Sequence, residues 1–185
     1  MGVIILKNIS YKVALGGVIS AISVFIMMLT GIIPLGVYVF PAIAGLTLVL
    51  IVIEVSAKWA LLCYIAVSIL SLLVTPDIEA KLMFIFFLGY YPIIKAYLEQ
   101  TRYRIVEWIL KFVLFNISVI IAYMLIIHVF GPNEIMDEFG AFGKYGAWIM
   151  LGAGNIVFVL YDITISRLVM TYLHWLRPRV LRRFR

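Results

Sequence analysis

The chain has 185 residues, of which 65% are hydrophobic and 13% are charged, and its mean hydropathy is +1.16. Soluble domains carry roughly 25% charged residues, so this composition excludes an ordinary water-soluble domain and indicates a protein built for lipid. The net charge is +6. A basic tail such as "RPRVLRRFR" can bind nucleic acid in principle, but beside a membrane helix it is expected to meet anionic lipid headgroups.

Six apolar segments follow one another, each near the ~20 residues that a helix needs to cross ~30 Å of hydrocarbon. They are too long and too evenly apolar for the strands of a membrane barrel. The sequence therefore predicts an all-α integral membrane protein with one six-helix domain over residues 1–185 and a basic tail at 174–185. The predicted transmembrane helices are 13–33, 36–54, 57–75, 80–98, 105–130 and 146–173.

The orientation follows from the positions of the basic residues. If the N-terminus is cytoplasmic, 13 of the 15 lysines and arginines fall on the inner face, and only Lys81 and Lys144 fall outside. Cytoplasmic loops carry such an excess of positive charge, so both termini are predicted to be cytoplasmic, in a bacterial plasma membrane. The first apolar stretch is too long for a signal peptide and is expected to remain as a helix.

The first predicted helix gathers small residues in its inner half. Ala14, Gly17 and Ala21 recur at i, i+3 and i+7 and therefore lie on one side of the helix. Small residues let a second helix approach closely, which is how membrane helices associate without a hydrophobic driving force. The partner is either another helix of the same chain or a second membrane protein.

The fourth predicted helix contains "GYYPIIK" at residues 89–95. Pro92 lacks an N–H and clashes with the preceding turn, so we expect the helix to bend near Gly89. The two tyrosines can donate to carbonyls that the bend frees. Lys95 lies ~22 Å along the helix axis, and we expect its side chain to extend to the inner headgroups rather than into a pocket.

Polar and aromatic residues of three helices are predicted to meet in the outer half of the bundle. A few polar groups among aromatic rings are typical of a small-molecule pocket, although an interfacial aromatic belt with polar groups joining helices explains the same residues equally well. The glycine-rich segment 131–146 is then either a lid or a connector. The candidate substrate-binding residues are Lys81, Phe84, Tyr123, His128, Trp148 and Asn155.

Catalytic signatures are missing from the sequence. It contains no HExxH, no G-x-S-x-G and no nucleotide-binding G-x-x-x-x-G-K-[ST], so we predict no enzyme, no metal and no cofactor, and any ATP use must come from a partner. Asp162 falls within the last helix, where a carboxylate needs a partner. Pairing with Lys95 or Lys111 is one interpretation, and a proton site is the other.

The whole plan resembles the S component of energy-coupling factor (ECF) transporters. The resemblance is carried by the size, the six helices, the cytoplasmic termini, the outer aromatic mouth and the stretch "KVALGGVISA" at 12–21. It implies capture of a vitamin-like small molecule in the outer half. It also implies docking, through Ala14, Gly17 and Ala21, on a transmembrane scaffold driven by two ATPases. The nickel and cobalt members begin Met-His, whereas this chain has Gly2, so a metal substrate is not expected.

Two other classes of function stay open. One is a structural protein of the cell envelope that resembles the shape-determining MreD proteins and has no small-molecule substrate. The other is an intramembrane enzyme, which the missing signatures disfavour. The outer loops carry more acidic than basic residues, which favours a neutral or cationic solute if the chain binds one. The outer acids are Asp77, Glu79, Glu134, Asp137 and Glu138.

Overall fold

The structure is a computed structural model that describes residues 9–33, 36–130 and 145–176. All regular structure in these ranges is helical and no strand is found in them, which confirms the predicted all-α class. The described residues fall into two compact units, with 9–130 in the first and 145–176 in the second. The predicted loop 131–146 lies outside the described residues except for its last two positions, and the tail lies outside them from residue 177 onward.

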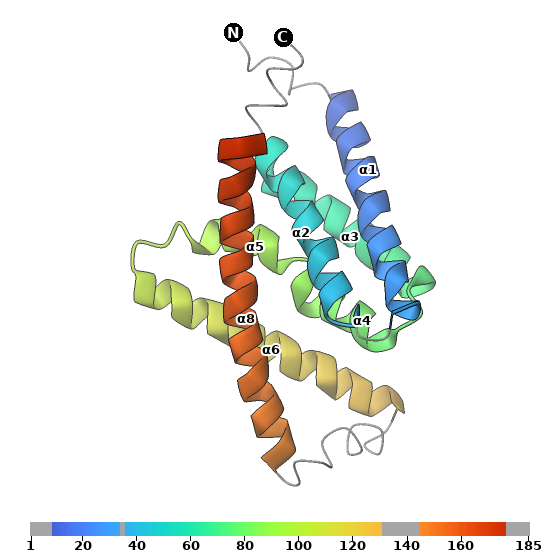
Figure 1. Ribbon diagram of the computed structural model, residues 1–185, viewed down its shortest axis with the longest axis vertical. Coiled ribbons are helices and arrows are strands. Elements are labelled where there is room, and N and C mark those ends of the chain that lie inside the picture. Colours follow the sequence, from blue (N-terminus) through green and yellow to red (C-terminus); the bar gives the residue numbers. More distant parts are fainter. Residues whose placement is uncertain (1–8, 34–35, 131–144, 177–185) are drawn as a thin grey trace. The chain divides into compact units, whose positions relative to one another are not determined.

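The first unit contains six α-helices, a 3-10 turn and a π-helical segment among its described residues (Figure 1). In chain order they are α1 (Ile9–Met28), η2 (Leu29–Gly31), α2 (Val39–Glu54), α3 (Ala57–Val74), α4 (Ile78–Met83), η4 (Phe84–Leu88, π-helical), α5 (Tyr91–Leu98) and α6 (Arg104–Phe130). The second unit consists of α8 (Gly146–Thr171), continued by the π-helical η6 (Tyr172–Leu176).

Five stretches of the described chain are long and apolar enough to cross a membrane: Ile9–Gly31, Ala57–Val74, Ile78–Leu98, Arg104–His128 and Trp148–Trp175. The sixth predicted span corresponds to α2, which is apolar but has only 16 residues. At ~1.5 Å per residue α2 covers ~24 Å, somewhat less than the ~30 Å hydrocarbon core. The structure thus supports a multi-pass membrane protein with at least five helices of spanning length.

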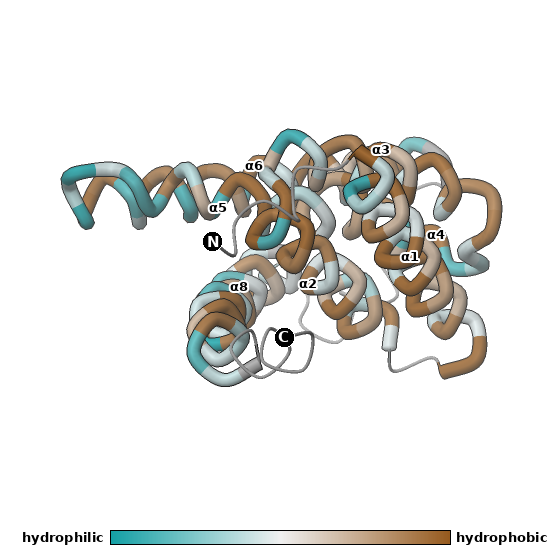
Figure 2. The backbone as a smooth tube through the Cα atoms, turned by 90° about the horizontal axis from the view of Figure 1, so that it is seen from above, coloured by the Kyte–Doolittle hydropathy of each residue, from teal (hydrophilic) through white to brown (hydrophobic). Residues whose placement is uncertain are grey.

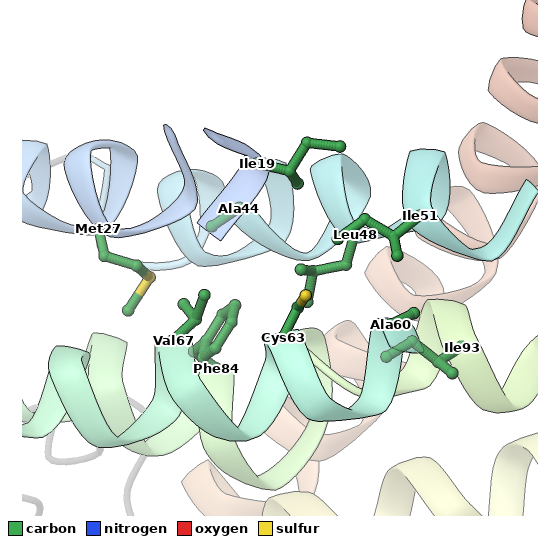
Figure 3. Packing of buried hydrophobic residues seen from close by; sticks show 10 residues of the cluster. All are labelled: Ile19, Met27, Ala44, Leu48, Ile51, Ala60, Cys63, Val67, Phe84 and Ile93. Atoms are coloured by element: carbon green, nitrogen blue, oxygen red, sulfur yellow. The ribbon is translucent and has the colours of Figure 1, made fainter. Parts of the chain in front are cut away.

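Helices α1, α2 and α3 pack against one another as a bundle, and α1 and α3 are joined through α2 by short connections (Figure 1). They share a cluster of buried apolar side chains. Figure 3 shows Met27 of α1 facing Val67 of α3 and Phe84 of η4, with Cys63 and Leu48 beside them. Burial of such side chains contributes about 1.5–3 kcal/mol each in water, whereas between helices in lipid close packing is the main attraction.

Large apolar side chains also cover the outside of the bundle. Leu73 is 80% exposed, Ile105 76% and Val18 58%. In Figure 2, hydrophobic residues occur all along α1, α2 and α3 rather than on inward faces alone. A helix that is hydrophobic on all sides is typical of a membrane span, where lipid covers the outward faces.

Two short connections, one after α1 and one before α4, lie against each other. The Asp77 carboxylate accepts a hydrogen bond of 2.8 Å from the backbone N–H of Ala80 and so caps the start of α4. A methyl group added at Gly31 would meet Pro76 Cγ at 2.5 Å. The turn after α1 therefore touches the turn before α4, and only glycine fits there.

The fourth predicted helix is broken at the predicted position. The backbone N–H of Gly89 bonds to the carbonyl of Phe84 at 2.8 Å, which closes a π-turn, and α5 begins at Tyr91 with Pro92 in its first turn. This confirms the break near Gly89. The Ile85 carbonyl receives a hydrogen bond of 2.5 Å from the Tyr64 hydroxyl of α3.

Candidate functional site

Three polar side chains meet at the end of the first unit that is predicted to face outward. Tyr38 precedes α2, Glu79 lies in the first turn of α4, and Tyr123 lies in the outer part of α6. The hydroxyls of both tyrosines donate to the same Glu79 oxygen, Oε1, with the Tyr123 bond at 3.0 Å, and the two hydroxyl oxygens lie 2.9 Å apart. We call Tyr38, Glu79 and Tyr123 the outer triad.

The phenols of the outer triad act as donors. Partial burial, together with the neighbouring Tyr123 and Glu79, raises the pKa of the Tyr38 hydroxyl above its ordinary value, so this hydroxyl stays protonated at neutral pH. Hydrogen bonds to an ionised acceptor are stronger than neutral ones. The triad therefore holds an acceptor-only carboxylate at the junction of three helices.

Three of the predicted substrate-binding residues lie in the first unit but are not part of the outer triad. Phe84 is fully buried in the hydrophobic core, where its ring lies 6.0 Å from that of Tyr64. Lys81 is half-buried on α4, and His128 is exposed near the outer end of α6. Of the predicted residues in this unit, only Tyr123 joins the outer triad.

The other two predicted residues, Trp148 and Asn155, lie on α8 in the second unit. Trp148 is 73% exposed, as an interfacial tryptophan would be. The Asn155 side-chain amide donates to the carbonyl of Leu151 on its own helix at 2.8 Å. The predicted pocket joins α6 and α8 across the two units and includes a loop outside the described residues, so it stays a prediction.

The predicted docking residues lie on the exposed face of α1. Ala14, Gly17 and Ala21 are all exposed, and a methyl group added at Gly17 would meet no atom within 4 Å. The neighbouring Gly16 is buried, and a methyl group there would lie 3.0 Å from Cys63 Sγ. Within the described structure, α1 therefore packs on α3 through the Gly16 side and leaves the predicted stripe uncovered.

The C-terminal end of α5 and the N-terminal part of α6 carry a cluster of charges. Glu99 Oε1 lies 2.8 Å from Lys95 Nζ and 3.3 Å from Lys111 Nζ, and Lys111 Nζ lies 2.6 Å from Glu107 Oε1. The Lys95 side chain is only 3% exposed. The prediction that Lys95 extends to the headgroups is therefore wrong, because its ammonium group pairs with Glu99 and the packed helices cover the side chain.

Asp162 lies on α8, whereas Lys95 and Lys111 lie in the first unit. The predicted ion pair would join the two units and stays a prediction, as does the proton site. Among the described residues, no three His, Cys, Asp or Glu side chains gather as a metal ion would require.

Sequence reasoning missed the outer triad as a group. It noted Glu79 only as one of five outer acids, and it did not select Tyr38. Tyr38 and Tyr123 lie 41 and 44 positions from Glu79 along the chain, so no local motif connects the three residues. A usable signal was present nonetheless, because each residue falls at an outer helix end on the predicted topology.

Comparison with known proteins adds no family to these findings: no protein-family model matches the chain, and no curated protein and no solved structure is significantly similar to it.

Proposed function

We propose that this chain is the substrate-binding membrane subunit of an ECF-type uptake transporter for a vitamin-like micronutrient. It would capture a small molecule in its outer half and dock on a scaffold that two ATPases drive. The observation that carries the proposal is the uncovered stripe of Ala14, Gly17 and Ala21 on α1, beside a Gly16 face that is used for internal packing. A helix with two such small-residue faces can pack internally and still receive a partner.

The topology that this function needs has six crossings, with both termini in the cytoplasm of a bacterial cell. Helices α1 and α3 are both of spanning length, and only Val55 and Ser56 separate α2 from α3. If α2 did not cross, Lys58 and Trp59 at the start of α3 would lie on the outer face, against the positive-inside rule. The 16 residues of α2 therefore serve as the second crossing, with modest local thinning of the bilayer.

Replacing Gly17 by Leu tests the docking step. Leu would project into a partner's backbone, and loss of a central interface contact costs ≥ ~2 kcal/mol, or about thirtyfold in affinity. We expect co-purification with a co-expressed scaffold and ATPase module to be lost, while the thermal unfolding temperature stays that of wild type.

Ala66→Leu is the matched control, because Ala66 is an exposed small residue of α3 away from the stripe. It should co-purify with the module like wild type. Gly17→Leu that still co-purifies fully would count against the transporter subunit.

An envelope scaffold of the MreD type is the second candidate. It is favoured by the outer triad, which joins α4 to α6 and to the residue before α2 through hydrogen bonds within the chain itself. Mass spectrometry of the purified protein separates the two candidates. A bound small molecule supports the transporter subunit, and lipid alone supports the scaffold.

A further inference from the structure

The outer triad contains a carboxylate whose charge is only partly compensated. Glu79 Oε1 accepts both phenolic hydrogen bonds. Within the ranges that the structure describes, no Lys, Arg or His forms an ion pair with Glu79, and Oε2 has no hydrogen-bond partner. Neutral phenol dipoles stabilise an anion without neutralising it.

The position of Glu79 makes the missing countercharge costly. The residue is half-buried at the junction of α2, α4 and α6, where a charge is screened less than in open water. Tyr38 and Tyr123 hold the carboxylate in place, so it cannot swing out to solvent without breaking two hydrogen bonds. A preorganised, unneutralised carboxylate suits a cation.

We propose that the outer triad binds the positively charged group of an organic cation, with Glu79 Oε2 as the ion-pairing atom. The proposal rests on the function proposed above and assigns the substrate class: an ammonium or similar nitrogen cation rather than an anionic solute. The open Oε2 receives the charged group, while Tyr38 and Tyr123 keep Oε1 occupied. Phe84 is buried in the core and takes no part.

Glu79→Gln separates binding from folding. Glutamine keeps a side-chain oxygen that accepts both tyrosine hydroxyls and removes only the charge. Asp77→Asn is the matched control, because it removes the same charge two residues away and asparagine caps a helix as well as aspartate does.

The probes are two cations with their uncharged counterparts: choline with 3,3-dimethylbutan-1-ol, and benzylamine with benzyl alcohol. Binding to the purified full-length protein is measured by isothermal titration in the same detergent for all variants. We expect both cations to bind wild type more tightly than their counterparts. We expect Glu79→Gln to weaken cation binding about tenfold to a hundredfold, with Asp77→Asn unchanged.

Three results would overturn the proposal: equal binding of cations and neutral counterparts, unchanged cation binding in Glu79→Gln, or no binding of either cation. The outcome is independent of the docking test. If the cations fail while Gly17→Leu still loses the ATPase module, the transporter subunit stands and the substrate class is wrong. If the cations bind while Gly17→Leu stays with the module, the site stands and the transporter subunit is wrong.

Discussion

At the scale of single residues, Glu99 shows how this chain places charge in an apolar protein. One of its oxygens bridges two lysines from different helices, and both lysines are almost fully buried. Lys111 also contacts Glu107 and lies 5.2 Å from the centre of the Trp108 ring. Buried ammonium groups need such compensation, so Glu99 joins α5 to α6 at their inner ends.

We predict that Glu99→Gln lowers the free energy of unfolding by about 1–3 kcal/mol. Breaking a buried pair costs about 3–5 kcal/mol and an exposed pair at most about 1, and Glu99 is itself 43% exposed. Thermal unfolding in detergent measures the change, with Asp77→Asn as a control of equal charge. A Glu99→Gln protein as stable as wild type would mean that the bridge contributes nothing.

At the scale of elements, the segment from α4 to α5 is one predicted helix that folds as three pieces. The π-turn at η4 shifts the hydrogen bond of Gly89 from Ile85 to Phe84, and the Tyr64 hydroxyl then satisfies Ile85. The Tyr90 hydroxyl instead lies 2.7 Å from Ser118 Oγ of α6. Tyrosines thus connect the broken helix to α3 and α6, and the break is supported from both sides.

Gly89 is expected to be essential for this break. A methyl group there would lie 2.8 Å from the Phe84 carbonyl oxygen, which is backbone and cannot turn aside. We predict that Gly89→Ala lowers the free energy of unfolding by about 1–3 kcal/mol, the usual cost of overpacking.

Gly17→Ala is the control for this substitution, because Gly17 lies in an exposed helix position with open space around it. Alanine is the better helix former there by about 1 kcal/mol, so the control should be as stable as wild type or more stable. Thermal unfolding of both variants gives the comparison. If the unfolding temperatures of both variants shifted in the same direction, the role of the Phe84 contact would be contradicted.

At the scale of the whole molecule, the topology is defined by the side of the membrane on which each connection between helices lies. The turn at η2 and the start of α4 belong to the outer face, and the connection between α5 and α6 belongs to the inner face, if the basic residues are read by the positive-inside rule. The outer triad and the Glu99 bridge then lie at opposite surfaces.

Cysteine labelling of intact cells tests the topology in a Cys63→Ala background. Ile32 is 74% exposed beside η2, and Tyr103 is 66% exposed before α6. We predict that a membrane-impermeant maleimide labels Ile32→Cys in intact cells and labels Tyr103→Cys only after permeabilisation. The reverse pattern would invert the topology and place the outer triad in the cytoplasm.

The sequence by itself indicated a lipid environment, the all-α class and the approximate positions of the helices. Apolar segments long enough to span a bilayer indicate a membrane protein. Helix ends depend on local signals, so the predicted segments begin and end within a few residues of the observed helices. The break at Gly89 was also local, because Pro92 and Gly89 cause it within one turn. The spacing of the small residues on α1 could be read from the sequence, but what packs against them could not.

The tertiary structure decided which side of each helix faces inward. Gly16 and Gly17 are identical in sequence terms, yet one packs on Cys63 and the other is open. Helices that are apolar all round carry no amphipathic signal for their rotation, so only contacts between distant segments set it. The same reason explains the buried Lys95 and the meeting of Glu79 with its two tyrosines, since both depend on residues that only the packing of helices brings together.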